Sequence, residues 1–367
     1  MFLSILTVLL FSSVSSNLVD DHEVPESNLT RFDILTSDLS WNESDYINFT
    51  VSPIKIVDSV EWWYRILIDD EDPNYNWSIT AANNSWCTGS GTYLDPYIIE
   101  NLYINAGGFG GMICIRNSNK FFFIRNCWFD YSGRNEFDIG VLLMWAGNGT
   151  IDSNIFTYLH CGTNMMQLSY NNTVSNNVMI SDHKTAGVGR GIELSCDNNT
   201  ILNNKIRNFY SAIGVFRSLN VVVDGNYAEN TIWSEGYQGI PIYASNCNHS
   251  TVVRNVLAGS FASGVFQLDE IDSSDNIIEN NTVITDDLWV FGPETSGTTL
   301  STPKLSQSDS GAITLSESHF NLIAHNIMLQ ESVDVNGGAI QGFDIFILMG
   351  MFGVISVLLA VVKRKKR

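Results

Sequence analysis

Short runs of alternating apolar and polar residues, each centred on an asparagine, recur along most of the chain. The stretches NNTVSNNVMI (171–180) and DNNTILNNKI (197–206) are two nearly identical examples. Asparagine forms both helices and strands poorly, so a repeated pair of asparagines inside an apolar pattern needs a structural reason. The recurrence indicates an internal repeat.

Nine asparagines align when these two stretches are extended along the chain. Successive gaps are 25, 28, 23, 27, 22, 29, 26 and 45 residues, so the last gap holds either a degenerate unit or a long insertion. The aligned residues are Asn101, Asn126, Asn154, Asn177, Asn204, Asn226, Asn255, Asn281 and Asn326.

The positions that flank these asparagines are apolar in all nine units. They lie three residues before and two residues after each asparagine. Positions an odd number apart on a straight strand point to opposite faces, so both flanks can face one core only if the chain bends at the asparagine. Each unit is therefore predicted to be a strand, a bend and a strand, and glycine-led runs such as GIEL (191–194) and GVFQL (264–268) supply a further strand.

Units of this length, built from short strands, match the coils of a parallel β-helix, in which each strand pairs with its equivalent one coil on. Equivalent residues then stack ~4.8 Å apart. The side-chain amide of one stacked asparagine can donate to the carbonyl of the next. The nine aligned residues are accordingly predicted to form a buried Asn ladder. The predicted fold is an all-β, single-stranded parallel β-helix (solenoid).

The repeat, together with the opening segment DDEDPNYNWSITAANNSWCTGSGTYLDPYIIENLYI (69–104), resembles a known superfamily. It is similar to the right-handed parallel β-helix repeat proteins of the pectin-lyase-like superfamily, including the NosD-like branch, and in particular to archaeal cell-surface members. The resemblance covers about 61–340. It implies a right-handed coil and a position at the cell surface.

Both ends of the chain are predicted to be targeting segments. MFLSILTVLLFSSVSS is typical of a cleaved signal peptide. An 18-residue uncharged run (345–362) followed by KRKKR is long enough to cross a bilayer and predicts a transmembrane helix. The predicted order is 1–16 signal peptide, 17–60 acidic segment rich in glycosylation sequons, 61–342 β-helix with a cap at 61–96, 343–362 transmembrane helix and 363–367 basic cytoplasmic tail.

This order predicts a single-pass membrane protein whose β-helix lies outside the cell. The sequence leaves open whether the C-terminal anchor is kept. A Gly-Phe pair before the apolar run resembles a sorting signal, but Gln341 stands where that signal usually has proline.

Ten Asn-x-Ser/Thr sequons are consistent with an extracellular glycoprotein. Asn148, Asn171 and Asn198 each precede a ladder asparagine by six residues, so they should stack on one outer edge. Glycans ~5 Å apart would crowd, which predicts incomplete occupancy and an edge that is not the binding face. The sequons begin at Asn28, Asn42, Asn48, Asn76, Asn83, Asn148, Asn171, Asn198, Asn248 and Asn280.

The charge balance excludes nucleic acid as a partner. The chain has 19 Lys and Arg against 39 Asp and Glu, for a net charge of −20. Binding to nucleic acid needs concentrated basic residues that displace counterions. Six cysteines allow fifteen disulfide pairings, and buried free thiols are an equally good interpretation.

The best candidate site is an acidic cluster beside the long insertion. It could hold calcium next to a tryptophan that stacks on sugar, or it could be a solvated acidic turn. Another acidic run, DDEDP (69–73), lacks the spacing of a known cation loop. The candidate residues are Asp269, Glu270, Asp272, Asp275, Asp286, Asp287 and Trp289.

Two functional hypotheses follow. The first is a membrane-anchored surface protein with a binding, adhesive or structural role toward glycans or surface proteins. The alternative is an anchored polysaccharide lyase or glycoside hydrolase, since the resembled superfamily includes both, some of them with calcium. Three outward carboxylates on neighbouring coils, or two with an arginine, would favour the enzyme. An outward column of Leu142, Glu193, Phe216, Pro241 and Phe266, counted from the leading glycines, offers one carboxylate. The six scattered histidines give little support for copper handling, and catalytic residues cannot be named from the sequence.

Overall fold

The computed structural model describes residues 54–56, 64–133, 138–181, 189–230, 233–234, 237–238, 240–259, 266–269, 273–285, 299–300, 313–315, 322–324, 327–331, 343–351 and 354–360. The predicted signal peptide, most of the acidic segment and the basic tail lie outside these residues.

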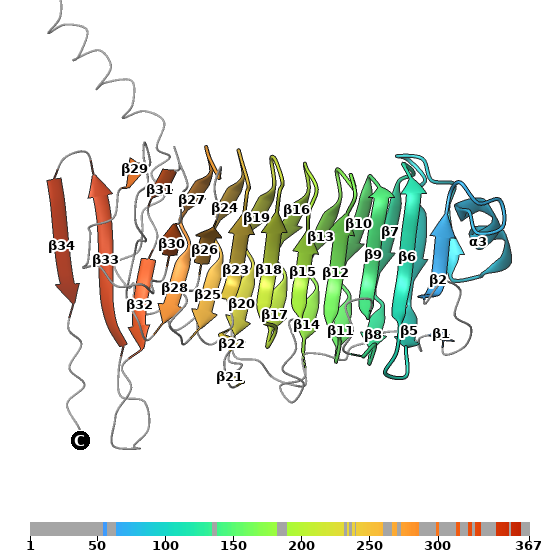
Figure 1. Cartoon of the computed structure of the whole chain (residues 1–367), viewed down its shortest axis with the longest axis horizontal. Helices are drawn as coiled ribbons and strands as arrows, with labels where there is room; N and C mark the ends of the chain where they lie inside the picture. The colour runs from blue at the N-terminus through green and yellow to red at the C-terminus, as the bar shows by residue number, and fades with distance from the viewer. Residues whose placement is uncertain are drawn as a thin grey trace, which may run out of the picture. The chain divides into compact units, whose positions relative to one another are not determined.

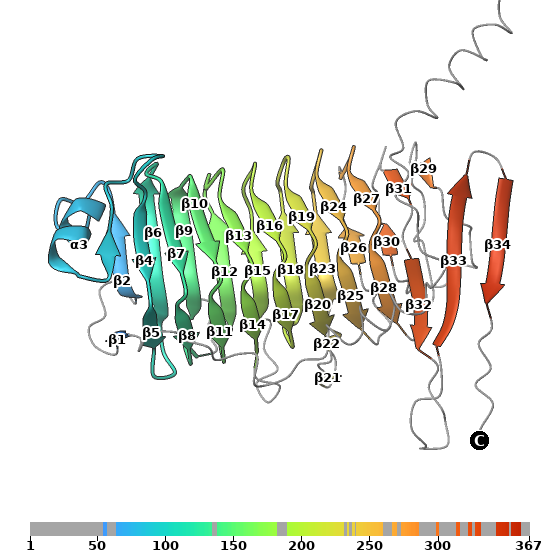
Figure 2. The ribbon, with the colours of Figure 1, turned by 180° about the vertical axis from the view of Figure 1, so that it is seen from behind.

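The described strands form three long sheets, because successive coils each contribute one strand to every sheet (Figure 1; Figure 2 shows the same ribbon from behind). Equivalent strands pair in parallel from coil to coil, as the repeat predicts. The fold is a parallel β-solenoid of the right-handed type, the hand that parallel strand connections nearly always take.

The nine-stranded sheet is ordered β2 (Tyr64–Asp69), β6 (Gly111–Ser118), β9 (Ile139–Ala146), β12 (Cys161–Met166), β15 (Arg190–Leu194), β18 (Ser211–Phe216), β23 (Ile240–Ser245), β26 (Phe266–Asp269) and β30 (Ile313–Leu315). The eleven-stranded sheet is ordered β29 (Thr299–Leu300), β31 (Leu322–Ala324), β27 (Ile277–Glu279), β24 (Thr251–Val253), β19 (Val222–Asp224), β16 (Thr200–Leu202), β13 (Thr173–Ser175), β10 (Gly149–Asp152), β7 (Phe122–Arg125), β4 (Tyr97–Glu100) and β3 (Cys87–Thr88).

The twelve-stranded sheet is ordered β1 (Ile54–Ile56), β5 (Leu102–Asn105), β8 (Trp128–Asp130), β11 (Ile155–Thr157), β14 (Val178–Ile180), β17 (Lys205–Arg207), β20 (Tyr227–Asn230), β25 (Val256–Gly259), β28 (Thr282–Thr285), β32 (Ile327–Glu331), β33 (Phe343–Met351) and β34 (Val354–Ala360). A separate antiparallel pair joins β21 (Trp233–Ser234) and β22 (Tyr237–Gln238).

A short helix, α3 (Trp77–Asn83), lies at the end of the solenoid next to β2 (Figure 1). The all-β prediction did not include it. Asn76 caps its N-terminus by accepting a hydrogen bond from the Ile79 N–H, which satisfies one of the otherwise unpaired amides of a first helical turn. Trp77 is buried and stacks on Tyr97 with ring centroids 4.8 Å apart, so the helix is fastened to the first coil by aromatic packing.

The core is built from in-register columns of inward side chains. Burying such columns in a shared interior is the main stabilising term of the fold. One column contains Ile124, Ile151, Val174, Ile201, Val223, Val252 and Ile278, all buried.

The bend between two of the sheets lies one residue earlier than the sequence pattern predicts. The residue before each ladder position, not the ladder asparagine itself, takes the left-handed conformation, with φ from 52° to 64°. Asparagine and glycine tolerate this conformation best. The bend residues are Asn101, Asn126, Ser153, Asn176, Asn203, Gly225, Arg254 and Asn280.

Two of the nine predicted ladder residues are therefore wrong. Asn101 and Asn126 have positive φ and occupy the bend column. The ladder position after Asn126 is Cys127, whose N–H donates to Asn154 Oδ1 at 2.9 Å. The sequence alignment was one residue out in these two coils because an asparagine happens to fill the bend. Asn326 lies outside the described residues.

The other six aligned asparagines form one continuous hydrogen-bonded ladder in the buried interior. From Asn177 onward, each Oδ1 accepts from both the backbone N–H and the Nδ2 of the preceding member, at 2.8–3.0 Å. Each Nδ2 also donates to a backbone carbonyl of the coil before. The members are Asn154, Asn177, Asn204, Asn226, Asn255 and Asn281.

A second, shorter ladder was not predicted. Gly149 N–H donates to Asn172 Oδ1, and Asn172 N–H donates to Asn199 Oδ1, both at 2.9 Å. The residues before them, Asn171 and Asn198, have positive φ. Each Asn-Asn pair in the stretches 171–180 and 197–206 is thus one bend residue followed by one ladder residue, which explains the duplicated pattern.

The 45-residue gap contains an insertion, because neighbouring coils pair directly across it. Strand β27 pairs with β31, and β28 pairs with β32. Between 286 and 312 the structure describes one additional strand, β29, which adds to the outer side of β31.

The C-terminal segment differs from the predicted transmembrane helix over 343–362. It contains β33 and β34, an antiparallel pair that extends the twelve-stranded sheet. The segment is rich in β-branched residues and phenylalanine, which favour strands, and Gly350 and Gly353 weaken a helix. Among the described residues, no helix is long and apolar enough to cross a membrane.

All six cysteines are buried and unpaired. Burial raises the pKa of Cys87, Cys114, Cys127 and Cys196 to about 12 and that of Cys247 to about 11. These residues therefore act as small apolar core residues and not as a disulfide framework.

Candidate functional site

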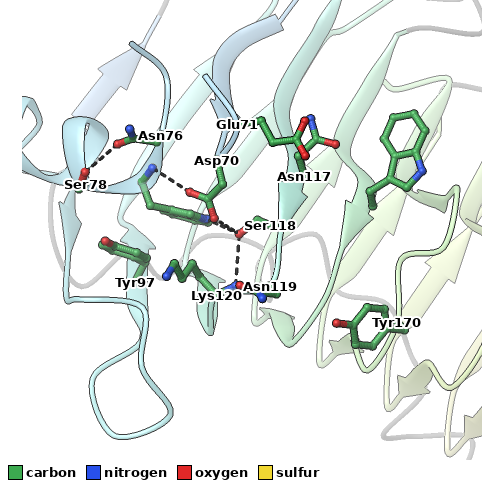
Figure 3. Close-up of a pocket in the computed structure, with 12 residues that line it drawn as sticks. Asp70, Glu71, Asn76, Ser78, Tyr97, Asn117, Ser118, Asn119, Lys120 and Tyr170 are labelled. Carbon is green, nitrogen blue, oxygen red and sulfur yellow. Dashed lines mark hydrogen bonds between the residues drawn. The ribbon is translucent and has the colours of Figure 1, made fainter. Parts of the chain in front are cut away.

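An open groove of about 830 Å³ lies where the first coils leave the nine-stranded sheet. We call it the cap groove. Its walls come from the turn after β2, from α3, from the start of β4, from the ends of β6 and β9, and from the turns that follow β6 and β12 (Figure 3). Polar side chains with a few aromatic rings line it, among them Glu71, Asn117, Lys120, Trp145 and Tyr170.

Two aromatic residues of the groove are unusually exposed. Trp145 is 45% exposed and Tyr170 is 42% exposed. Trp145 also has a φ of 49°, a conformation that is strained for a bulky side chain. Equivalent bends in other coils carry Asn117, Gln167, Arg217 and Asn246, all with positive φ, so this bend is a regular part of the coil. Trp145 is the bulky, exposed aromatic residue among these five.

The floor of the groove is a rigid hydrogen-bonded network (dashed lines in Figure 3). Asp70 Oδ2 accepts from the Ser118 hydroxyl at 2.6 Å, and Ser118 Oγ accepts from the Trp77 indole N–H at 3.1 Å. Asp70 Oδ1 accepts from the Trp77 N–H at 3.4 Å. Tyr170 stands apart from this network in Figure 3. The network fixes α3 against β6, so the groove is preorganised.

Next to the groove, Asp69 is held as a carboxylate. Burial alone would raise the pKa of Asp69, but hydrogen bonds from Asn117, Arg116 and the Glu71 N–H outweigh it and lower the pKa. Arg116 Nε lies 2.7 Å from Asp69 Oδ2, and Asn117 Nδ2 lies 2.9 Å from Asp69 Oδ1. This pair neutralises itself, so the free charges of the groove are those of Asp70, Glu71 and Lys120.

The sequence did not predict the cap groove as a site. The sequence feature that came nearest to the cap groove was the run DDEDP (69–73), because Asp70 and Glu71 of this run line the groove. Trp145 and Tyr170 come from different coils, and the register that brings them together depends on bends that sequence spacing does not fix.

The acidic cluster proposed as the candidate site lies mostly outside the described residues. Asp269 ends β26, next to Ser245 of β23. Asp275 has a positive φ at the bend before β27, and its carboxylate lies 4.0 Å from His249 Nδ1. Glu270, Asp272, Asp286, Asp287 and Trp289 lie outside the described residues, so the proposed calcium site stays a prediction.

Of the outward column counted from the leading glycines, only Leu142 and Glu193 share one column in the structure, and the other three members are wrong. In the pairing register, Leu142 is followed by Asn164, Glu193, Gly214 and Tyr243. Phe216 belongs to the next outward column, and Phe266 pairs with inward-facing Ile242. The error arose because the strands begin at different distances from their glycines.

The eleven-stranded sheet carries two carboxylates with an arginine on neighbouring coils. Glu100, Arg125 and Asp152 lie side by side on β4, β7 and β10. Arg125 Nε is 2.8 Å from Glu100 Oε2, and both side chains are exposed enough to meet solvent. Asp152 Oδ1 accepts from the hydroxyl of Ser175 and the amide of Asn176. We call these three residues the carboxylate–arginine row.

The described sequons lie mostly at turns. Asn171 N–H donates to the Asn198 carbonyl at 3.0 Å, so these two sequon residues stack on adjacent coils, and the Asn148 amide donates to Asn119. Tyr170 of the cap groove immediately precedes Asn171, and the expectation that this edge is not the binding face stays a prediction. Asn76 itself lines the groove. Asn28, Asn42 and Asn48 lie outside the described residues.

A parallel β-solenoid with a preformed polar and aromatic groove is the class of protein that these features define. The family model described as "Periplasmic copper-binding protein (NosD)" matches residues 76–270 and 196–342. The chain belongs to this family. No curated protein matches it.

The described residues do not fit a copper site. Copper is bound by thiolate, thioether or imidazole groups gathered around one point. Among the parts of the chain that the structure describes, no group of three or more His, Cys, Asp or Glu could hold a metal. Burial also raises the pKa of the thiols, which opposes the thiolate form that binds metals.

Several solved structures are similar in fold. The surface adhesin PfbA of Streptococcus pneumoniae has 12% identity and a TM-score of 0.41, over 72% of this chain and 76% of that one. DFA-IIIase from Arthrobacter chlorophenolicus A6 has 15% identity and a TM-score of 0.40, over 65% and 60%. The mannuronan C-5 epimerase AlgE6 A-module of Azotobacter vinelandii has 11% identity and a TM-score of 0.31, over 62% and 73%. Likeness at this level concerns the fold alone.

Proposed function

We propose that the protein is a cell-surface β-solenoid that binds uncharged carbohydrate in the cap groove. The observation that carries the proposal is the exposed pair Trp145 and Tyr170 in a groove that is otherwise lined mainly by polar side chains. Aromatic rings offer a flat apolar face. Amide and carboxylate groups beside them match hydroxyl donors and acceptors. This combination suits a sugar ring, which has an apolar C–H face and a polar rim.

The charge of the groove favours an uncharged or amino sugar over an acidic one. Asp70 and Glu71 outnumber Lys120 there, and the whole chain carries a net charge of −20. A polyanion would meet like charge both locally and at long range. Uronate or sulfated polysaccharides are therefore poor ligands in this proposal.

Calorimetric titration of the full-length chain tests the proposal. The probes are uncharged gluco-, manno-, galacto- and N-acetylglucosamine disaccharides, with a uronate disaccharide for comparison. We expect at least one uncharged disaccharide to bind and the uronate not to bind. Trp145→Ala and Tyr170→Ala should each weaken binding about tenfold, since one stacked ring contributes on the order of 1 kcal/mol or slightly more.

Tyr158→Ala is the matched control. Tyr158 is 55% exposed and has a φ of 58°, so it shares the exposure and backbone conformation of Trp145 but does not line the groove. Equal weakening by Tyr158→Ala, tighter binding of the uronate, or no binding of any probe would contradict the proposal.

We further propose that the chain acts outside the cell and is attached to the membrane by its apolar C-terminal segment. The support is the leader-like first 16 residues, the ten sequons, and the uncharged run before KRKKR. Removing 343–367 should move the protein from the membrane fraction to the medium. Unchanged fractionation would exclude this mode of attachment.

A second candidate function, a polysaccharide lyase or glycoside hydrolase, is favoured by the carboxylate–arginine row. Glu100 and Asp152 are two strands apart, ~9–10 Å, close to the roughly 6.5–9.5 Å that separates an acid and a base in inverting glycosidases. Release of new sugar ends from a polysaccharide panel, with and without calcium, tests it. Activity lost in Glu100→Gln and Asp152→Asn would establish the enzyme at this row, whereas loss in Asp269→Asn and Asp272→Asn would place it at the acidic cluster.

A further inference from the structure

A second polar and aromatic patch lies on the outward face of the nine-stranded sheet. Arg190 Nη1 is 2.8 Å from Glu193 Oε1, and the Arg190 guanidinium carbon lies 4.8 Å from the centre of the Phe216 ring. The Phe216 ring lies 5.3 Å from the Tyr243 ring, tilted by 45°. Asn164 Nδ2 is 3.5 Å from Glu193 Oε2. We call Asn164, Arg190, Glu193, Phe216 and Tyr243 the outer patch.

The outer patch is preorganised by its strands. Asn164, Glu193, Gly214 and Tyr243 occupy one in-register column across β12, β15, β18 and β23. A Cβ at Gly214 would lie 2.8 Å from a carbon of the Phe216 ring and 3.2 Å from Arg190 Cδ. Glycine at this position therefore leaves the space that Phe216 needs to lie against Arg190.

Among the described residues, Glu193 is the one side chain that accepts a hydrogen bond from the Arg190 guanidinium. An arginine has five N–H donors in a fixed plane, and the contact with Glu193 uses Nη1. Phe216 and Glu193 together fix that plane, so donors, a carboxylate acceptor and two rings converge on one surface. The opposite charges of Arg190 and Glu193 cancel, so the outer patch is suited to an uncharged ligand.

The outer patch and the cap groove lie along the same face. Trp145 of the groove directly follows Met144, and Met144 pairs with Met166 in the next coil. Ser195 and Phe216 continue this outward column, because Met165 pairs with Leu194 and Leu194 pairs with Val215. Met144 and Met166 are half-buried and Ser195 is exposed, so side chains between the two sites are accessible to solvent.

We infer that one extended uncharged glycan chain lies along the solenoid axis, from the cap groove across β9, β12, β15 and β18 to the outer patch. This inference rests on the proposed function of the groove. Trp145 and Phe216 are three strands apart, which is ~14 Å, and Tyr243 lies one strand further. A disaccharide stacked on Trp145 therefore cannot reach Phe216 or Tyr243, whereas a longer oligosaccharide can.

The test is calorimetric titration of the full-length chain with the disaccharide and the octasaccharide of the sugar that binds best. We expect the octasaccharide to bind at least about tenfold more tightly, since two further rings contribute. Phe216→Ala and Tyr243→Ala should each remove most of that gain while leaving disaccharide affinity unchanged. Gly214→Ala should do the same by displacing the Phe216 ring, and Tyr243→Phe should retain the gain.

The outcomes separate the two proposals. If neither sugar binds, the proposed function of the groove fails, and this inference fails with it. If both bind equally, or if the octasaccharide gain survives Phe216→Ala, Tyr243→Ala and Gly214→Ala, the groove stands and the extended track is excluded. Tyr158→Ala controls for loss of an exposed ring, and melting curves show that each variant is folded.

Discussion

Asn204 is the place where the Asn ladder can be tested quantitatively, through the substitution Asn204→Ala. The side chain is fully buried. Its Oδ1 accepts from Asn177 N at 3.0 Å and from Asn177 Nδ2 at 2.9 Å. Its Nδ2 donates to Val174 O at 2.8 Å and to Asn226 Oδ1 at 3.0 Å. Alanine removes all four contacts at once.

The expected loss follows from the groups that stay behind. Asn226 Oδ1 still accepts from the Asn204 N–H at 2.9 Å, so it keeps a partner. The backbone N–H of Asn177 and one N–H of its side-chain amide lose their acceptor, Asn204 Oδ1, in a buried site. Each buried donor left unpaired costs about 1–3 kcal/mol, and a small cavity adds to this. We expect a loss of about 3–5 kcal/mol in the free energy of unfolding, a large share of the 5–15 kcal/mol typical of a domain.

The adjacent bend residue provides the matched control, Asn203→Gly. Asn203 is exposed with a φ of 53°, and Gly225 occupies the equivalent position one coil on. Glycine adopts this conformation without strain, so the change should stay within about 1 kcal/mol.

Urea denaturation of the full-length chain, followed by circular dichroism, gives both values. Hydrogen exchange at the Asn177 amide should increase only in Asn204→Ala. Equal small losses in both variants, or an Asn177 amide that stays protected, would refute the idea that the ladder stabilises the coils.

Four further predictions concern other parts of the molecule. Ellman's reagent should detect almost no thiol in the native chain and six thiols after unfolding without reductant, because all six cysteines are buried and unpaired; fewer than six would reveal disulfides. Burial raises the thiol pKa from 9.0 to about 12 in the fold, so the unfolded chain ionises first. Stability to urea should be constant between about pH 6 and 9 and fall as the pH rises toward 12; a flat profile there would contradict the burial. Trp145→Gly should weaken disaccharide binding about tenfold while raising the free energy of unfolding by up to about 1 kcal/mol, because it relieves the positive φ; a destabilised variant would show that Trp145 serves packing. A glycan on Asn76, which lines the groove, should block disaccharide binding, and Ser78→Ala, which removes the sequon but keeps the cap residue, should restore it; binding by protein shown by mass spectrometry to be glycosylated at Asn76 would exclude that geometry.

The repeat could be predicted because one residue type, asparagine, recurs every 22–29 residues along most of the chain. Apolar residues and asparagines at repeated positions mark the side chains that point into the coil. Each coil must place such side chains at the same positions, because they stack on those of the next coil. The exact register could not be predicted in the first two coils. Asn126 fills a bend and Cys127 fills the ladder position, so a rule that follows asparagine alone selects the wrong residue.

The candidate sites were harder to predict because they depend on surface positions brought together by that register. That Trp145 and Tyr170 line one groove can be seen only from the geometry of the bends at the ends of β9 and β12. The Phe216 ring reaches Arg190 only because Gly214 carries no side chain. Isolated polar or aromatic residues at such positions follow no periodic pattern in the sequence. The acidic cluster at 269–289 was predicted as the site instead, because its charged residues lie close together in the sequence.

The most direct test of the account is hydroxyl-radical footprinting of the full-length chain with and without the best-binding octasaccharide. We predict that the sugar protects Trp145 and Tyr170, and then Met166, Phe216 and Tyr243 along the same face, while Tyr131 and Tyr158 on the other edge remain as reactive as before. Protection centred on Tyr131 and Tyr158, or on Trp289 in the long insertion, would contradict the cap groove as the binding site.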